Sequence, residues 1–166
     1  MKGKPMSIRI WALPLVLVVS PLTACSSGSV DANAAAAERL VDVTIATQQG
    51  PRTFRVEVAS TAEAQDRGLM FRTDIPQDGG MLFYPYPGDG GPPRESGIWM
   101  KNTPTALDII FIREDRTIAR IAENAVPFDE TTLRSGGPVA AVLEVHAGKA
   151  AELGIAAGDK VSWEGL

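Results

Sequence analysis

The chain contains a single cysteine, Cys25, among its 166 residues. One thiol cannot form a disulfide within the chain, and it cannot supply the cysteine clusters that hold structural zinc. The fold must therefore be stabilised by the packing of apolar side chains. The composition allows this, because 45% of the residues are hydrophobic and the length suits one domain of ordinary size.

The segment before Cys25 has the organisation of an export signal. Three basic residues lie within residues 1–9, and an apolar stretch runs from Ile10 to Val19. This stretch has about ten residues, whereas a transmembrane helix needs roughly 20. The sequence Leu22-Thr23-Ala24-Cys25 resembles the lipobox of bacterial lipoproteins. The resemblance implies that residues 1–24 are a lipoprotein signal peptide and that Cys25 is lipidated.

A lipidated Cys25 determines where the protein is expected to lie. Two or more acyl chains hold a protein stably on a membrane. We therefore expect an exported protein that is lipid-anchored to the bacterial membrane, on the periplasmic side of the outer membrane if the cell has one. The alternative is cleavage at Ala32-Asn33-Ala34 to give a soluble product, but Ala32 lies far beyond the apolar stretch.

The chain that remains after removal of residues 1–24 is acidic. It has 142 residues, and because three basic residues are lost its formal net charge changes from −4 to −7. An acidic chain argues against a nucleic-acid partner, whose phosphates require a basic surface. With Cys25 lipidated and His146 the only histidine, we expect no metal site and no cofactor.

The mature chain divides into a tether and one domain. Residues 25–39 are small and polar and predict a flexible tether. Residues 40–166 form the domain. Alternating apolar residues and short apolar runs predict strands at residues 41–45, 54–58, 80–84, 98–101, 107–112, 117–122, 140–145 and 160–163.

Two short helices complete the predicted domain. Ser60 and Glu63 match a capping box for a helix that ends at Gly68, and a second helix is expected over 147–153. Residues 85–97 are rich in proline and glycine and predict a loop. We expect this loop to be either a lid over Trp99 or a surface loop of variable sequence without such a role. The predicted fold class is mainly β (α+β), a small curled antiparallel sheet or partly open barrel with two short helices.

Four segments of this domain carry a pattern of residues. They are Arg67-Gly68-Leu69-Met70-Phe71-Arg72, Gly80-Met81-Leu82-Phe83, Trp99-Met100-Lys101-Asn102-Thr103 followed by Leu107-Asp108, and Leu143-Glu144 followed by Ala147-Gly148. In order and spacing they resemble the DUF192 family, also called UPF0127, over roughly residues 41–163. The resemblance implies a single small domain, often exported or lipid-anchored, with no established activity. His146 departs from the family pattern, which argues against a shared histidine mechanism.

The segment Trp99–Pro104 joins an aromatic ring, a cation and an amide. If Trp99 and Lys101 share one face of an extended segment, Met100 and Asn102 point the other way. Such an edge could stack on the ring of a ligand, such as a sugar, and form hydrogen bonds to its rim. The alternative is that Trp99 fills the core and that Asn102 helps to form a turn before Pro104.

Two carboxylates interrupt apolar strands. Asp108 and Glu144 are each flanked by apolar residues, and such carboxylates are desolvated unless a cation pairs with them. Facing each other, they could act as general acid and base on a glycoside. They could equally bind a hard cation. The structural alternative is a buried ion pair with Arg72 or Lys101, or a carboxylate that accepts hydrogen bonds from a loop backbone. Arg72 could equally clamp an anion.

These residues favour a binding or accessory module for an envelope ligand, meaning a glycan, a peptide or a small anion. The candidate ligand-binding residues are Arg72, Trp99, Lys101, Asn102, Asp108 and Glu144. The alternatives are a hydrolase that uses Asp108 and Glu144, and a structural or assembly factor without a ligand site. Binding is favoured because the polar groups are mixed in sign and no nucleophile–base pair is evident.

Overall fold

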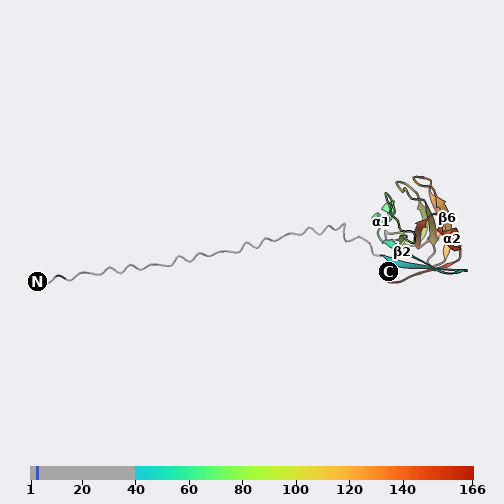
Figure 1. Ribbon diagram of the computed structural model, residues 1–166, viewed down its shortest axis with the longest axis horizontal. Coiled ribbons are helices and arrows are strands. Elements are labelled where there is room, and N and C mark those ends of the chain that lie inside the picture. The colour runs from blue at the N-terminus through green and yellow to red at the C-terminus, as the bar shows by residue number, and fades with distance from the viewer. Residues whose placement is uncertain (1–2, 4–39) are drawn as a thin grey trace.

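The computed structural model describes Gly3 and residues 40–166, so the predicted signal peptide, Cys25 and the tether lie outside the described domain. The domain is drawn in colour in Figure 1. Its strands are β1 (Val41–Thr47), β2 (Gly50–Ala59), β3 (Gly80–Phe83), β4 (Arg94–Ile98), β5 (Leu107–Ile112), β6 (Ile118–Ala125), β7 (Leu133–Val139), β8 (Ala141–His146) and β9 (Lys160–Trp163). Its helices are α1 (Ala62–Arg67) and α2 (Lys149–Leu153). Within residues 40–166, no helix is long and apolar enough to cross a membrane.

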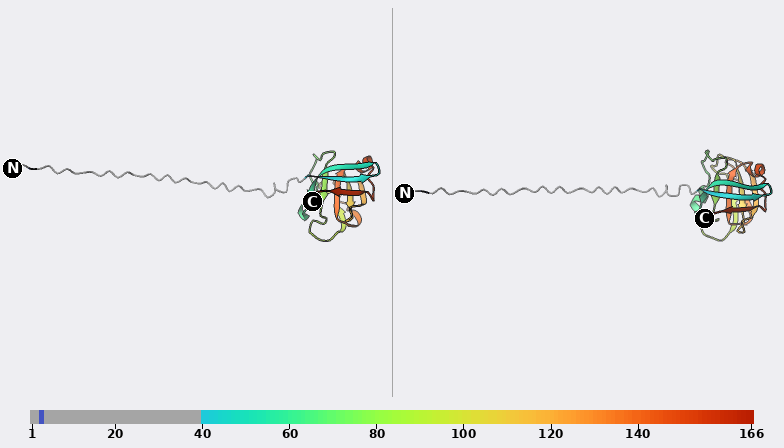
Figure 2. Two further views of the ribbon diagram at one scale, coloured as in Figure 1. Left: turned by 90° about the horizontal axis from the view of Figure 1, so that it is seen from below. Right: turned by 60° about the horizontal axis from the view of Figure 1, so that its bottom comes forward.

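Seven strands form one curled sheet in the order β6-β5-β8-β3-β2-β1-β9, and β4 and β7 form a separate two-stranded ribbon. Neighbouring strands of the sheet are antiparallel except β2 and β3, which are parallel. The sheet curls until its edges meet at one end, where the amide of Ile118 donates to Asp159 O at 2.9 Å. Figure 2 shows β1, β2 and β9 lying across the strands of the other half. The result is a half-barrel.

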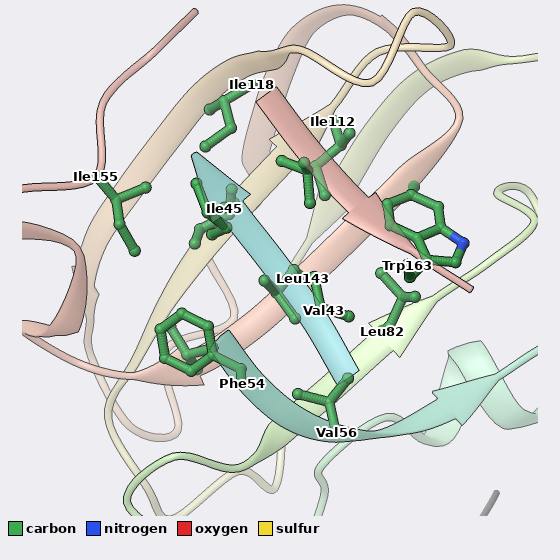
Figure 3. Close-up of a cluster of buried hydrophobic side chains, with 14 of the residues drawn as sticks. Val43, Ile45, Phe54, Val56, Leu82, Ile112, Ile118, Leu143, Ile155 and Trp163 are labelled. Carbon is green, nitrogen blue, oxygen red and sulfur yellow. The ribbon is translucent and has the colours of Figure 1, made fainter. Parts of the chain in front are cut away.

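The inside of the curl holds the first hydrophobic core. Side chains from opposite halves of the half-barrel meet there, as Figure 3 shows for Val43 and Ile45 of β1 and Leu143 of β8. Alternation explains the contribution of β1, because every second residue of this strand points inward. Trp163 closes one end, with its ring edge-on to Tyr84 at 4.9 Å and the Arg116 guanidinium 3.4 Å from its centroid.

The outer face of the sheet holds a second core. Ile109 and Phe111 of β5 and Val142 of β8 lie on this face, under the β4–β7 ribbon and the segment that follows α1. Because β5 and β8 are covered on both faces, all six residues of β5 and five of the six in β8 are buried. This explains why both strands are continuous apolar runs in the sequence.

The predicted mainly-β, curled architecture with two short helices is confirmed, but some elements differ. The sheet is mixed rather than wholly antiparallel. Thr61, not Ser60, caps α1, accepting from the amide of Ala64 at 3.2 Å. The prediction that residues 85–97 are entirely loop is wrong, because β4 begins at Arg94 and ends at Ile98. The strand expected at 98–101 is consequently misplaced, and β7 was not predicted.

Candidate functional site

A cavity of about 150 Å³ opens on the outer face of the sheet, between α1, the loop of residues 84–93 and the segment after β4. Its lining includes Thr103 and Glu144 as buried polar residues and several buried apolar residues of the second core: Leu69, Phe83, Ile98, Met100 and Leu107. The volume is comparable with that of a cavity that admits a benzene-sized molecule. It therefore suits a small ligand, or one end of a larger one.

All four segments of the sequence pattern meet at this cavity. The first segment contributes Arg67–Met70, the second contributes Phe83, and the fourth contributes Glu144. The third contributes Trp99, Met100, Thr103 and Leu107. Segments separated by more than half of the length of the domain thus line one hollow.

Glu144 is the buried acidic group of the cavity. Its side chain comes from the central strand β8, and the residue is only 4% exposed. Within the described domain its carboxylate has no ion-pair or hydrogen-bond partner, and one oxygen lies 3.9 Å from the position that a Cβ would take on Gly68. Burial raises the pKa of the Glu144 carboxyl to about 8. A neutral carboxyl can both donate and accept a hydrogen bond.

Asp108 and Glu144 point to opposite faces of the sheet. In the antiparallel β5–β8 pair Asp108 lies opposite Val145, and Ile109 lies opposite Glu144. Directly opposed residues share a face and successive residues alternate, so the two carboxylates are separated by the sheet. The hypothesis of a paired-carboxylate hydrolase is therefore wrong.

Asp108 has a structural role, which agrees with the alternative that such a carboxylate accepts hydrogen bonds from the backbone. The residue is fully buried, and its two oxygens accept from the amides of Asn124 and Ala150, each at 2.8 Å. These bonds join β5 to β6 and to the first turn of α2. Asp108 lines none of the described cavities and is not retained as a ligand-binding residue.

The Trp99 segment follows the predicted alternation. Met100 is buried in the second core, whereas Trp99 is 45% exposed at the cavity. The ammonium of Lys101 lies 5.1 Å from the centroid of the Trp99 ring, so both side chains occupy one face. Asn102 is half-buried in the turn that follows, with a φ of 54°, and its carbonyl accepts from the amide of Phe71 at 2.8 Å. Lys101 and Asn102 thus flank the cavity without lining it.

Arg72 lies outside this cavity and is already paired. Its guanidinium binds Glu57 through two bonds of 3.0 and 3.1 Å and binds Asp74 at 3.0 Å. These partners raise the pKa of Arg72, with Glu57 contributing most. The expected pairing of Arg72 with Asp108 or Glu144 is wrong. The guanidinium lines a separate hollow beside Leu40 and Ile75.

The loop of residues 84–93 forms one wall of the cavity and is fastened to α1. Gln65 makes the attachment: its amide donates to Ala59 O at 3.0 Å and to Pro85 O at 2.7 Å, and its oxygen accepts from the amide of Gly88 at 2.7 Å. A Cβ on Gly88 would lie only 2.5 Å from the carbonyl carbon of Thr61, so the two backbones touch. Gln65 was not among the predicted residues.

Replacing Gln65 tests this attachment. Gln65→Ala should lower the unfolding free energy by about 1–2 kcal/mol, because three backbone groups lose a partner. The amide of Gly88 should also exchange faster with deuterium, as measured by NMR. The matched control is Gln77→Ala, which truncates an exposed glutamine outside this loop and should change neither quantity. Unchanged exchange at Gly88 in Gln65→Ala would contradict the proposed attachment.

Exposed apolar side chains surround the Trp99 segment. Phe71 is 70% exposed, Val126 61% and Phe128 62%. Phe71 bonds the backbone of Asn102, and the amide of Phe128 donates to Thr103 O at 3.2 Å. The cavity therefore opens beside an apolar rim, which sequence periodicity could not reveal because these residues lie in turns.

The described residues contain no cluster of three or more potential metal ligands. His146 ends β8 and is half-buried, and its Nε2 lies 2.8 Å from Ile75 O. It does not line the cavity.

Comparison with known proteins places the chain in a family. Residues 43–163 match the family model DUF192, described as "Uncharacterized ACR, COG1430". The chain belongs to the DUF192 family. No curated protein matches it significantly.

Two solved structures resemble this DUF192 domain. A protein of unknown function from Novosphingobium aromaticivorans DSM 12444 is 48% identical, with a TM-score of 0.70 over 75% of this chain and 85% of its own. A protein from Sinorhizobium meliloti 1021, named a "putative transcription regulator", is 41% identical, with a TM-score of 0.70 over 76% of this chain and 95% of its own.

Proposed function

We propose that this DUF192 protein is an envelope-anchored binding module whose cavity at Glu144 holds a small envelope ligand or the end of a glycan or peptide. The observation that carries the proposal is Glu144 itself, a buried carboxyl without a protein partner in a cavity lined by all four sequence segments. A buried polar group without a partner is costly, and such groups concentrate at functional sites. A ligand that bonds Glu144 removes that cost.

The arrangement supports binding better than the alternatives. Hydrolysis by two carboxylates is not possible with Asp108 on the other face of the sheet. A purely structural role would not explain an unpaired buried carboxyl, since structural carboxylates are satisfied as Asp108 is. A small anion is disfavoured at the floor of the cavity, because Glu144 would repel it or offer it only a neutral carboxyl.

A nucleic-acid partner is not proposed for this chain. The name of the Sinorhizobium meliloti protein refers to transcription, but the mature chain carries a formal charge of −7. Phosphate contacts need a concentration of lysine and arginine.

The envelope location rests on Cys25. Replacing Cys25 with Ala should abolish incorporation of radiolabelled palmitate and move the protein from the membrane fraction to the soluble fraction or to unprocessed precursor. The matched control is Ser26→Ala, which keeps the acceptor thiol. Continued labelling of Cys25→Ala would exclude lipidation at this residue.

Ligand binding can be tested with a small panel of probes on the isotopically labelled full chain. N-acetylglucosamine, diglycine, n-butylamine and inorganic phosphate would each be titrated while the amides of Gly68 and Phe83 are followed by NMR. We expect at least one of the first three to shift these amides saturably, and phosphate to leave them unchanged.

A variant pair tests whether Trp99, which lines the cavity, contributes to binding. Trp99→Ala should weaken binding of the active probe about tenfold, in line with the loss of one aromatic contact of about 1 kcal/mol or more. Phe128→Ala, which removes an exposed aromatic ring that does not line the cavity, should not weaken binding. If no probe shifts the cavity amides, or phosphate alone does, the proposed site is wrong.

A further inference from the structure

We propose that the cavity takes an organic ammonium group, with the Glu144 carboxylate as its counter-ion. This inference rests on the proposed function, since it names the ligand chemistry of the same site. It follows from which polar groups around the cavity are already satisfied, from the charge that remains, and from the character of the walls.

Two polar side chains that line the cavity are committed elsewhere. Gln65 uses its amide on three backbone groups, which are Ala59 O at the end of β2 and, in the adjoining loop, Pro85 O and the amide of Gly88. The hydroxyl of Thr103 donates to Lys101 O at 3.2 Å. Neither side chain therefore has a free donor for the carboxyl. Tyr86 also lines the cavity, but within the described domain it makes no hydrogen bond to Glu144, so a ligand is the partner that we infer.

The charged residues that line the cavity leave one negative charge when Glu144 is ionised; Lys101 flanks the cavity, with its ammonium near the Trp99 ring, and is not part of this set. Arg94 of β4 pairs with Asp89 of the loop at 2.8 Å. Asp66 and Arg67, adjacent and exposed on α1, are opposite in sign. When the charges of these two pairs cancel, the charge that remains is the negative charge of Glu144. A cationic ligand completes the balance, whereas an anion would increase the imbalance.

The walls suit an organic cation better than a metal ion. A hard divalent cation takes six or more oxygen ligands, and the described residues hold no cluster of three potential ligands here. Phe83 and Trp99 offer aromatic rings, and aromatic faces attract ammonium groups. Trp99 already has the Lys101 ammonium 5.1 Å from its ring centroid. An alkyl group attached to the cation would contact the apolar walls.

Binding of an ammonium group should be coupled to release of a proton. The pKa of Glu144 is raised to about 8 by burial, so the carboxyl is mostly neutral at pH 7 and must ionise to serve as counter-ion. Affinity should therefore increase by up to about tenfold per pH unit between pH 6 and pH 8, and level off above pH 8. An alkylammonium ion, with a pKa near that of lysine at about 10.4, stays charged throughout this range.

The test compares n-butylamine with n-butanol, which differ mainly in the ammonium group. Both would be titrated into the full chain at pH 6, 7, 8 and 9, with the amides of Gly68 and Phe83 as reporters. We expect n-butylamine to bind at least tenfold more tightly than n-butanol at pH 8, with the pH dependence given above. Glu144→Gln should remove both the preference and the pH dependence, and a retained amide spectrum would show that it still folds.

The control for general attraction of cations to an acidic protein is Glu63→Gln. Glu63 is exposed in the first turn of α1 and does not line the cavity, so this variant should behave like the wild-type chain. Equal binding of the alcohol and the amine, or a preference that survives in Glu144→Gln, would overturn the ammonium proposal. If N-acetylglucosamine or diglycine shifts the cavity amides and n-butylamine does not, the ammonium proposal fails while the binding module stands. If no probe binds, both fail.

Discussion

The unfolding free energy of the wild-type chain should decrease by about 4–5 kcal/mol between pH 4.5 and pH 8, and Glu144→Gln should remove this decrease. Burial raises the pKa of Glu144 from 4.5 to about 8. In this window the unfolded chain has lost the proton of Glu144 while the folded chain retains it. Each pH unit therefore favours the unfolded state by about 1.4 kcal/mol, and the decrease ends near pH 8, where the folded state ionises as well.

Urea unfolding at pH 5, 6, 7, 8 and 9 would measure this slope. Four carboxylates with a lowered pKa affect the unfolding free energy in the opposite sense: Asp74, Asp89, Asp115 and Asp129. Their stabilisation is lost as the pH falls through their folded-state pKa, so their effect lies at more acidic pH. Glu63→Gln is the matched control and should retain the wild-type slope. A slope that persists in Glu144→Gln would show that another group causes it.

The strands of the main sheet could be predicted because their burial leaves a pattern in the sequence. In β1 alternate residues are buried, which gives a period of two. In β5 and β8 nearly every residue is buried, which gives apolar runs. Gly68 likewise marked the end of α1 correctly.

The β4–β7 ribbon could not be predicted from the same signals. β4 has a register shift between Glu95 and Gly97, and β7 contains Gly136, Gly137 and Pro138. Such residues are depleted in central strands but tolerated in a peripheral ribbon, where fewer ladder bonds are required. Only the tertiary structure shows that this ribbon covers the second core.

The site was predicted in part. Trp99 and Glu144 line the cavity, Lys101 and Asn102 flank it, and Arg72 lies elsewhere. Sequence reasoning finds a carboxylate within an apolar strand but does not show its face, because the face depends on the register between strands. The register of the β5–β8 pair places Asp108 and Glu144 on opposite faces of the sheet, and this register is known only from the structure.

Asp108→Ala should lower the unfolding free energy by about 2–4 kcal/mol, since one buried and one partly buried N–H donor would lose their acceptor at once. The donors are the amides of Asn124 and Ala150, each 2.8 Å from a different oxygen of Asp108. Asn124 adopts a φ of 53°, which costs energy in a non-glycine residue and depends on such support. Urea unfolding at pH 7 measures the loss, and hydrogen exchange at Asn124 and Ala150 should report it locally.

Two companion variants separate this structural role from a general effect of charge. Asp108→Asn keeps one acceptor oxygen and should lose less stability than Asp108→Ala, because one of the two donors stays satisfied. Asp42→Ala removes an exposed carboxylate from β1 and should change the unfolding free energy by no more than about 0.5 kcal/mol. If Asp108→Ala were as mild as Asp42→Ala, the two backbone bonds would not support the fold. Because Asp108 and the cavity lie on opposite faces of the sheet, any folded fraction of Asp108→Asn should bind the cavity probes as the wild-type chain does.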